Sequence, residues 1–209
     1  MTDNEEVSAN KLAETTIYHG AVQKIKELAA CIKLIQEHTK PERVLEIGTA
    51  TGGTFWLWCQ LATQAAHIIS LDLPMAKFSS DKGYNKGLLK SYAKPSQLLS
   101  FIKKNSHTDK AESKLKKIME PHALDLLFID GDHTYEGVKD DYHRYSKYVR
   151  TGGMIIFHDI VYHDQVQECQ VHRFWNELKV NETAYEFLDP EPDDRGWGSW
   201  GGLGVIIKG

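Results

Sequence analysis

The chain has 209 residues, a formal net charge of −4 and 41% hydrophobic residues. That length fits one domain, and the mild negative charge disfavours a general attraction to nucleic acid or to an anionic membrane. The three cysteines form no CxxC pair, the N-terminus lacks a secretory signal, and no run of about 18 apolar residues occurs. We therefore expect a cytoplasmic protein with no nucleic-acid or membrane partner.

The first 40 residues are predicted to be helical. Apolar residues recur with helical spacing over 11–38, and Gly20 can separate a short first helix from a longer second one. Lys40-Pro41 ends the pattern. We expect the whole chain, 1–209, to form one domain, in which residues 1–40 are a helical lid and residues 41–209 are the core.

From residue 41 onward, short apolar runs alternate with helical patterns. Helices are expected at 54–65, 86–92, 110–119, 135–149 and 171–179, the fourth ended by Gly152-Gly153. Strands are expected at 43–47, 67–71, 98–102, 124–129, 154–157 and 201–207. This alternation predicts an α/β, Rossmann-like, doubly wound sheet that is mainly parallel, with seven strands in all and an antiparallel last strand.

A glycine-rich turn follows the first expected strand. Glu46, Gly48 and Gly52 form the pattern acidic-x-Gly-x-x-x-Gly, in which glycine lets the backbone approach a ligand closely. The helix behind the turn presents free N–H groups to an anion or a carboxylate. A tight turn without a ligand gives the same pattern. The turn alone therefore indicates only a nucleotide-like ligand.

Asp72 ends the second expected strand. Its carboxylate can accept hydrogen bonds from both hydroxyls of an adenosine ribose, although a turn aspartate is the alternative interpretation. Together with the glycine turn, Asp72 indicates an adenosine-containing ligand. The dinucleotide fingerprint GxGxxG is absent, which disfavours a nicotinamide cofactor.

Two longer segments carry a resemblance to a known family. Residues 126–138, LLFIDGDHTYEGV, and residues 151–159, TGGMIIFHD, resemble the second half of macrocin-type O-methyltransferases, a class I S-adenosylmethionine-dependent group that includes cephalosporin-pathway enzymes. The resemblance covers roughly residues 42–160. It implies S-adenosylmethionine as cofactor, with Asp72 at the ribose and Ser106 near the adenine. Glu46, Gly48 and Gly52 would surround the methionine part of the cofactor, and Thr49 is a further predicted cofactor contact.

Polar side chains follow the fourth and fifth expected strands: Asp130, Asp132, His133, His158 and Asp159. The carboxyl ends of parallel strands meet at one edge of a sheet, so carboxylates from both strands can share a divalent cation. Related metal-dependent enzymes have an oxygen ligand where this chain has His158, and histidine suits Mn²⁺, Fe²⁺ or Zn²⁺ better than Mg²⁺. Asp130, Asp159 and His158 are the predicted ligands of a Mg or Mn ion.

His133 and His158 are also the candidate catalytic bases, because histidine titrates near neutral pH. Capping of the helix that starts near Thr134 is the structural alternative for His133 or Asp132. Trp197 and Trp200 indicate either an aromatic lid over a substrate or a packed turn before the last strand.

The expected reaction is transfer of a methyl group from S-adenosylmethionine to a hydroxyl of a small-molecule acceptor, a sugar or a natural product. Two alternatives remain open. One is an NAD(P)-dependent oxidoreductase, and the other is a non-catalytic S-adenosylmethionine-binding protein, which the departure at His158 leaves open. The identity of the acceptor and the formation of a homo-oligomer are not determined by the sequence.

Overall fold

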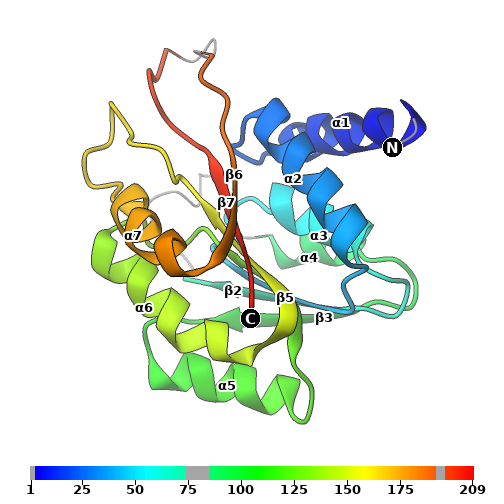
Figure 1. The fold of residues 1–209 in the computed structure, drawn as a ribbon. Helices are drawn as coiled ribbons and strands as arrows, with labels where there is room; N and C mark the ends of the chain where they lie inside the picture. Colours follow the sequence, from blue (N-terminus) through cyan, green and yellow to red (C-terminus); the bar gives the residue numbers. More distant parts are fainter. Residues whose placement is uncertain (1–2, 74–84, 192–195) are drawn as a thin grey trace.

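A seven-stranded sheet separates two layers of helices in the computed structural model, which describes residues 3–73, 85–191 and 196–209 (Figure 1). The order is β3-β2-β1-β4-β5-β7-β6. The first five strands run parallel, and β7 runs antiparallel to β5 and β6. The strands are β1 (Arg43–Ile47), β2 (His67–Asp72), β3 (Leu98–Lys103), β4 (Leu124–Ile129), β5 (Val149–His158), β6 (Thr183–Phe187) and β7 (Leu203–Ile207). The predicted Rossmann-like sheet with an antiparallel last strand is confirmed.

The central strands are buried on both faces, so successive side chains enter two different cores. Val44 packs into the core beneath α2 and α3, whereas Leu45 packs into the core beneath α5, α6 and α7. One helical layer holds α1 (Asp3–Tyr18), α2 (Ile25–His38), α3 (Gly53–Leu61) and α4 (Lys86–Ser91). The other holds α5 (Asp109–Met119), α6 (Tyr135–Tyr145) and α7 (Val171–Leu178).

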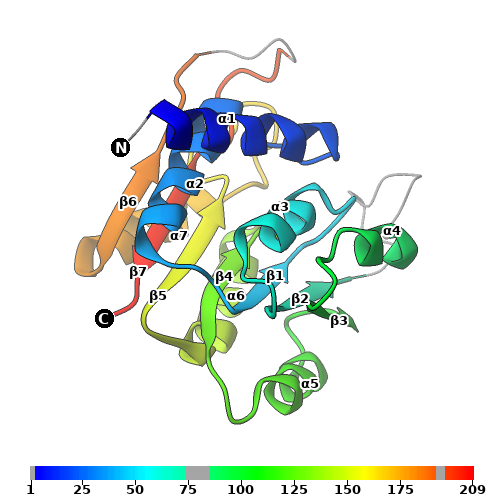
Figure 2. The same ribbon diagram turned by 90° about the vertical axis from the view of Figure 1, so that its right-hand side faces the viewer.

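The two N-terminal helices have different positions. α2 buries Leu28, Ile32 and Ile35 against the sheet and belongs to the core. α1 lies across the end of the molecule toward which the β5 arrow points (Figure 2). The segment that joins the two helices reaches the glycine turn, where Thr51 Oγ1 donates a hydrogen bond to Gly20 O at 2.9 Å. α1 and this joint thus lie at that end of the molecule and α2 lies in the core, and the lid expected over residues 1–40 stays a prediction.

The predicted helix over 135–149 is wrong at its C-terminal end. α6 ends at Tyr145, a 3₁₀ turn follows at Ser146–Tyr148, and β5 begins at Val149. Gly152, with φ of 72°, and Gly153 therefore lie inside β5, where its register shifts against β4. A Cβ on Gly153 would lie 2.6 Å from Val149 Cγ1, so the irregular strand needs glycine at this point.

β6 is the one strand that the apolar pattern does not reveal. It lies at the edge of the sheet, and Thr183, Tyr185 and Glu186 are exposed. An edge strand with three exposed residues of five lacks the apolar run that marks a buried strand. Among the described residues, no helix is both long enough and apolar enough to cross a membrane.

Candidate active site

The glycine turn after β1 touches the turns that follow β2 and β4. Gly48 N donates to Leu71 O at 3.0 Å, and Asp130 N donates to Ile47 O at 2.9 Å. Gly48 has φ of 87°, and a Cβ at this position would lie 1.9 Å from Asp130 O. Glycine is therefore required here for its conformation and for the close approach of the two turns.

Asp72, at the end of β2, stabilises the glycine turn through a hydrogen bond. Its Oδ2 accepts a 2.7 Å hydrogen bond from the backbone N–H of Ala50, which has φ of 45°. Burial raises the pKa of Asp72, although backbone N–H groups, including that of Ala50, oppose the shift. Gly52, with φ of 94°, caps α3, and a Cβ there would lie 2.2 Å from Leu89 Cδ2 of α4. β2, the turn, α3 and α4 thus fix one another.

Glu46 and Thr49 turn their side chains into the protein. Glu46 is fully buried, and its Oε1 accepts a 2.8 Å hydrogen bond from Trp58 Nε1 of α3. Burial raises the pKa of Glu46 to about 8, so this carboxyl is largely protonated at neutral pH. Thr49 Oγ1 lies 2.7 Å from Ser70 Oγ, and both side chains are buried. The predicted contacts of Glu46 and Thr49 with a cofactor stay predictions.

Ser106 lies in the loop after β3, which α6 holds in place. Tyr145 Oη donates to Ser106 O at 2.5 Å, and His107 Nε2 lies 3.4 Å from Asp141 Oδ1. Asp141 is fully buried, and a Cβ on Gly131 would lie 3.3 Å from its Oδ2. The loops after β3 and β4 therefore meet at Asp141. No sequence motif indicates Asp141, and the only feature that could have revealed it is a charged residue on the buried face of α6.

Four side chains from the ends of β4 and β5 come together as predicted. His133 Nε2 lies 3.1 Å from Asp130 Oδ1, and His133 Nδ1 lies 3.3 Å from Asp159 Oδ2. His158 Nδ1 lies 3.3 Å from Asp130 Oδ1 and 3.4 Å from Asp159 Oδ2. Each imidazole thus contacts both carboxylates. We call Asp130, His133, His158 and Asp159 the strand-end cluster.

The cluster is charge-balanced. Burial lowers the pKa of both imidazoles, but the facing carboxylates outweigh this effect and raise the pKa of His133 and His158 well above the ordinary value. The imidazoles in turn outweigh the effect of burial on Asp130 and Asp159, and lower the pKa of both carboxyls. The opposite charges of the cluster therefore favour the imidazolium form of both histidines and the carboxylate form of both aspartates.

Local backbone structure orients the side chains of the strand-end cluster. Asp159 has φ of 60°, a conformation that residues other than glycine rarely adopt and that often marks a functional site. Thr134 caps α6 by accepting a hydrogen bond from Gly137 N at 3.1 Å, so the capping role considered for His133 is wrong. Asp132 instead accepts a 2.9 Å hydrogen bond from Thr134 N and shapes the turn.

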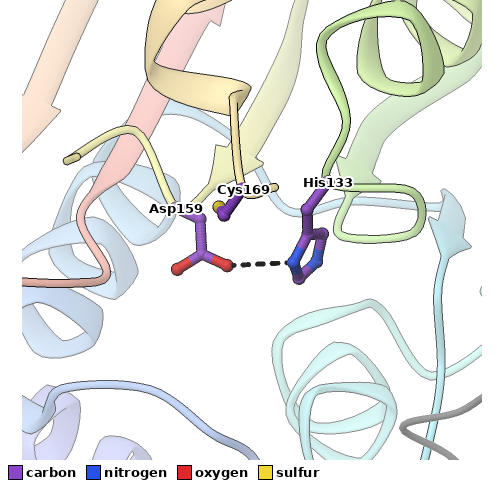
Figure 3. Close-up of side chains that lie close together, drawn as sticks. All are labelled: His133, Asp159 and Cys169. Carbon is purple, nitrogen blue, oxygen red and sulfur yellow. Dashed lines mark ion pairs between the residues drawn. The ribbon is translucent and has the colours of Figure 1, made fainter. Parts of the chain in front are cut away.

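The side chain of Cys169 also lies at this edge of the sheet, and no sequence pattern predicts that position. It lies just before α7, and the next residue, Gln170, donates its N–H to His133 O at 2.7 Å. Figure 3 shows the Cys169 and Asp159 side chains near that of His133. No local spacing connects Cys169 with His133, because α6 and β5 separate them in the chain.

A cavity of about 300 Å³ lies between the segments that follow β5 and β6 and the segment that precedes β7. Trp200 forms one wall, and its ring centroid lies 6.5 Å from that of His158. Trp200 is 2% exposed and packs beneath Lys24 Nζ at 5.5 Å, so it belongs to a packed turn rather than a mobile lid. The other lining residues are both apolar and polar: Lys24, Val161, Leu188, Asp189, Pro190, Gly198 and Ser199.

Two sequence comparisons match more than half of the chain to known proteins. The sequence model of a family described as a methyltransferase domain matches residues 45–160. An uncharacterized protein, R132, of Acanthamoeba polyphaga mimivirus is 34% identical over 143 residues, which are 68% of this chain and 62% of the viral protein. The chain thus spans less than two thirds of that relative.

Solved structures show the same fold. An O-methyltransferase from Bacillus cereus, in complex with S-adenosylhomocysteine (SAH), superposes with a TM-score of 0.61 at 13% identity and covers 100% of this chain and 92% of its own. The O-methyltransferase TomG from Streptomyces achromogenes, which is involved in tomaymycin synthesis and holds S-adenosylmethionine (SAM), gives 0.60 at 14% identity, again covering 100% and 92%.

Proposed function

Since the chain belongs to this family of methyltransferase domains, we propose that it transfers a methyl group from S-adenosylmethionine to a hydroxyl oxygen of a small-molecule acceptor. The observation that carries the proposal is the strand-end cluster, which lies at the same sheet edge as the glycine turn. A sulfonium methyl group is already activated, so the enzyme must mainly position the acceptor and remove its proton. The turn is suited to holding the cofactor, and the cluster is suited to removing the proton of the acceptor.

The proposed cofactor site runs along the turns after β1, β2 and β3. The N-terminus of α3 would bind the carboxylate of the methionine part, and Asp72 would bind the ribose. The bound SAH and SAM of the two solved structures support this choice of ligand. The proposed contacts are Glu46, Gly48, Thr49, Gly52, Asp72 and Ser106.

His133 is the proposed base. Its side chain is 32% exposed and reachable by an acceptor, whereas that of His158 is 4% exposed and closes the floor of the cluster. His133 acts in its neutral form, which it reaches when the incoming acceptor displaces its contact with one carboxylate. His158 contacts both Asp130 and Asp159 and holds the two carboxylates in position, which supports the proton transfer at His133.

A divalent cation fits the set Asp130, His158 and Asp159, whose ligand atoms lie within 4.8 Å of one another. One imidazole and two carboxylates suit Mn²⁺ and suit Mg²⁺ poorly, because Mg²⁺ prefers oxygen ligands only. When bound, such an ion would lower the pKa of the acceptor hydroxyl.

The cavity beside Trp200 is the proposed acceptor pocket. Its walls combine the apolar side chains of Trp200, Val161, Leu188 and Pro190 with the polar ones of Lys24, Asp189 and Ser199, which suits an acceptor with an apolar face and polar groups. Trp200 lies 6.5 Å from His158 between ring centroids, so the proposed acceptor would extend from the cavity past Trp200 toward the cluster.

Calorimetric titration of the purified protein with SAM, SAH and NAD tests the cofactor. We expect both sulfur nucleotides to bind and NAD not to bind. Binding of NAD alone would favour an oxidoreductase and overturn the proposal.

SAH release, measured with a panel of hydroxylated natural products, tests the reaction. We expect His133→Asn to keep its affinity for SAH and to lose transfer by roughly 10²–10⁴-fold, the usual contribution of a general base. His143→Asn, an exposed position on α6, is the matched control and should transfer normally. Cofactor binding without transfer to any acceptor would favour a non-catalytic binding protein.

A further inference from the structure

A second set of metal-ligating atoms lies beside the first. It consists of His133, Asp159 and Cys169, and their ligand atoms lie within 4.8 Å of one another (Figure 3). We propose that this set binds a zinc-class divalent ion, Zn²⁺ or Co²⁺, and that an ion held there inhibits methyl transfer. We call it the thiol site.

The donor atoms select the ion. Thiolate, imidazole and carboxylate are the three ligand types that Zn²⁺ uses in proteins, and Mg²⁺ does not take sulfur. A set of three protein ligands leaves the fourth tetrahedral position open to water. The thiol site therefore differs from the set Asp130, His158 and Asp159, which suits Mn²⁺.

One pair of ligand atoms already has the separation of an occupied site. His133 Nδ1 lies 3.3 Å from Asp159 Oδ2. Two ligands at about 2.0–2.1 Å from a tetrahedral ion lie about 3.3–3.4 Å apart, so these two atoms already have the required separation.

The surroundings hold the ligands in place. His133 Nε2, the ring nitrogen that would not bind the ion, lies 3.1 Å from Asp130 Oδ1. Metal-bound histidines almost always donate their other N–H in this way, often to a carboxylate. The 2.7 Å hydrogen bond from Gln170 N to His133 O ties the Cys169 segment to the histidine.

Inhibition follows from the shared side chains, and this part rests on the proposed function. An ion at the thiol site uses Nδ1 of His133, the proposed base, and the carboxylate of Asp159, which the Mn²⁺ set also needs. The two ions therefore compete for Asp159, and zinc-class binding leaves His133 unable to accept a proton.

Cobalt spectroscopy of the metal-free full chain tests the site without cofactor or acceptor. We expect titration with Co²⁺ to give the visible ligand-field bands of a four-coordinate ion and a sulfur-to-cobalt charge-transfer band in the near ultraviolet. Zn²⁺ should displace Co²⁺ and so remove the ligand-field and charge-transfer bands, and excess Mg²⁺ should leave these bands unchanged. A wild-type protein that shows no charge-transfer band, or loses Co²⁺ to Mg²⁺, overturns the proposal.

Three variants test whether the charge-transfer band comes from Cys169 at the thiol site. Cys169→Ser should lose it and bind Co²⁺ at least tenfold more weakly, and His133→Asn should also bind Co²⁺ at least tenfold more weakly. Cys31→Ala should keep the wild-type spectrum, because burial in α2 raises the pKa of the Cys31 thiol to about 12 and keeps it protonated. A band that survives in a folded Cys169→Ser protein contradicts the assignment, as does one lost in Cys31→Ala.

The transfer assay tests inhibition separately. Zn²⁺ should inhibit the wild type over the concentration range in which it displaces Co²⁺, and any residual transfer by Cys169→Ser should resist Zn²⁺ at least tenfold better. Equal inhibition of both proteins overturns the inhibitory role. The cobalt spectrum decides on the ion site even if methyl transfer itself fails.

Discussion

The carboxylate of Asp72 and the backbone N–H of Ala50 form a 2.7 Å hydrogen bond between the end of β2 and the glycine turn. The bond holds Ala50 at φ of 45°, where a residue with a Cβ is normally disfavoured. Asp72 therefore shapes the turn, in addition to its proposed contact with the ribose. Replacing it should affect cofactor binding through both routes.

Asp72→Asn should weaken SAH binding about tenfold, and Asp72→Ala should weaken it about a hundredfold. Asparagine keeps an oxygen for Ala50 N but loses the charge, whereas alanine loses both. Hydrogen bonds to charged groups contribute about 1.5–3 kcal/mol, which corresponds to these factors. Isothermal titration calorimetry measures them directly.

Asp125→Asn is the matched control. Asp125 also accepts backbone hydrogen bonds, from Glu42 N and Arg43 N at 2.8 and 2.9 Å, but it lies near the start of β4 at the opposite edge of the sheet. Its replacement should lower the thermal midpoint and leave SAH affinity unchanged. Equal losses of affinity in both variants would mean that Asp72 acts only through stability.

Gly48→Ala should unfold the glycine turn and abolish cofactor binding. Its Cβ would lie 1.9 Å from Asp130 O, a backbone atom that cannot move aside without separating β1 from β4. Gly196→Ala isolates the conformational part of this effect, because Gly196 has φ of 68° and no atom of the described residues lies within 4 Å of its Cβ position. Denaturant unfolding should show a loss of about 1–2 kcal/mol for Gly196→Ala and a larger one for Gly48→Ala.

The sequence predicts the parts of this molecule that local pattern controls. β1, β2 and β4 are short apolar runs, and the polar residues that follow them lie at one edge because parallel strands all end there. Asp130, His133, His158 and Asp159 could be placed together for this reason.

Long-range contacts account for what the sequence does not reveal. Cys169 and Trp200 reach the cluster from segments beyond β5, through loops that have no periodic pattern. β6 is exposed at the sheet edge, so its five residues give no apolar signal. The interior position of Glu46 depends on Trp58, a partner on the far side of the turn.

Gly53→Ala should release the N-terminal joint and leave α3 intact. Alanine favours a helix, but its Cβ would lie 2.2 Å from Ala21 N in the segment between α1 and α2. Limited proteolysis should cut within residues 1–24 faster than in the wild type, and SAH should dissociate faster if α1 covers the cofactor. Gly87→Ala, on the exposed face of α4, should change neither rate.

Glu46→Gln should change how the stability of the cofactor-free protein depends on pH. Burial raises the pKa of Glu46 from its ordinary 4.5 to about 8, so between these values the folded state keeps a proton that the unfolded state has lost. The free energy of unfolding must then fall as pH rises through this window, by up to about 1.4 kcal/mol per pH unit from this group. Glutamine still accepts the Trp58 hydrogen bond and has no proton to lose, so the variant should be the more stable protein at pH 8 and the slope should flatten. Urea unfolding at several pH values from 5 to 9 measures the difference.

Glu27→Gln supplies the contrast, because both Glu27 oxygens accept backbone hydrogen bonds, from Asp189 N and Gly202 N at 2.9 Å, and an amide can replace only one of them. That variant should be less stable than the wild type at every pH in the range. A Glu46→Gln protein with the wild-type slope would mean that this carboxyl is already ionised in the folded protein near neutral pH.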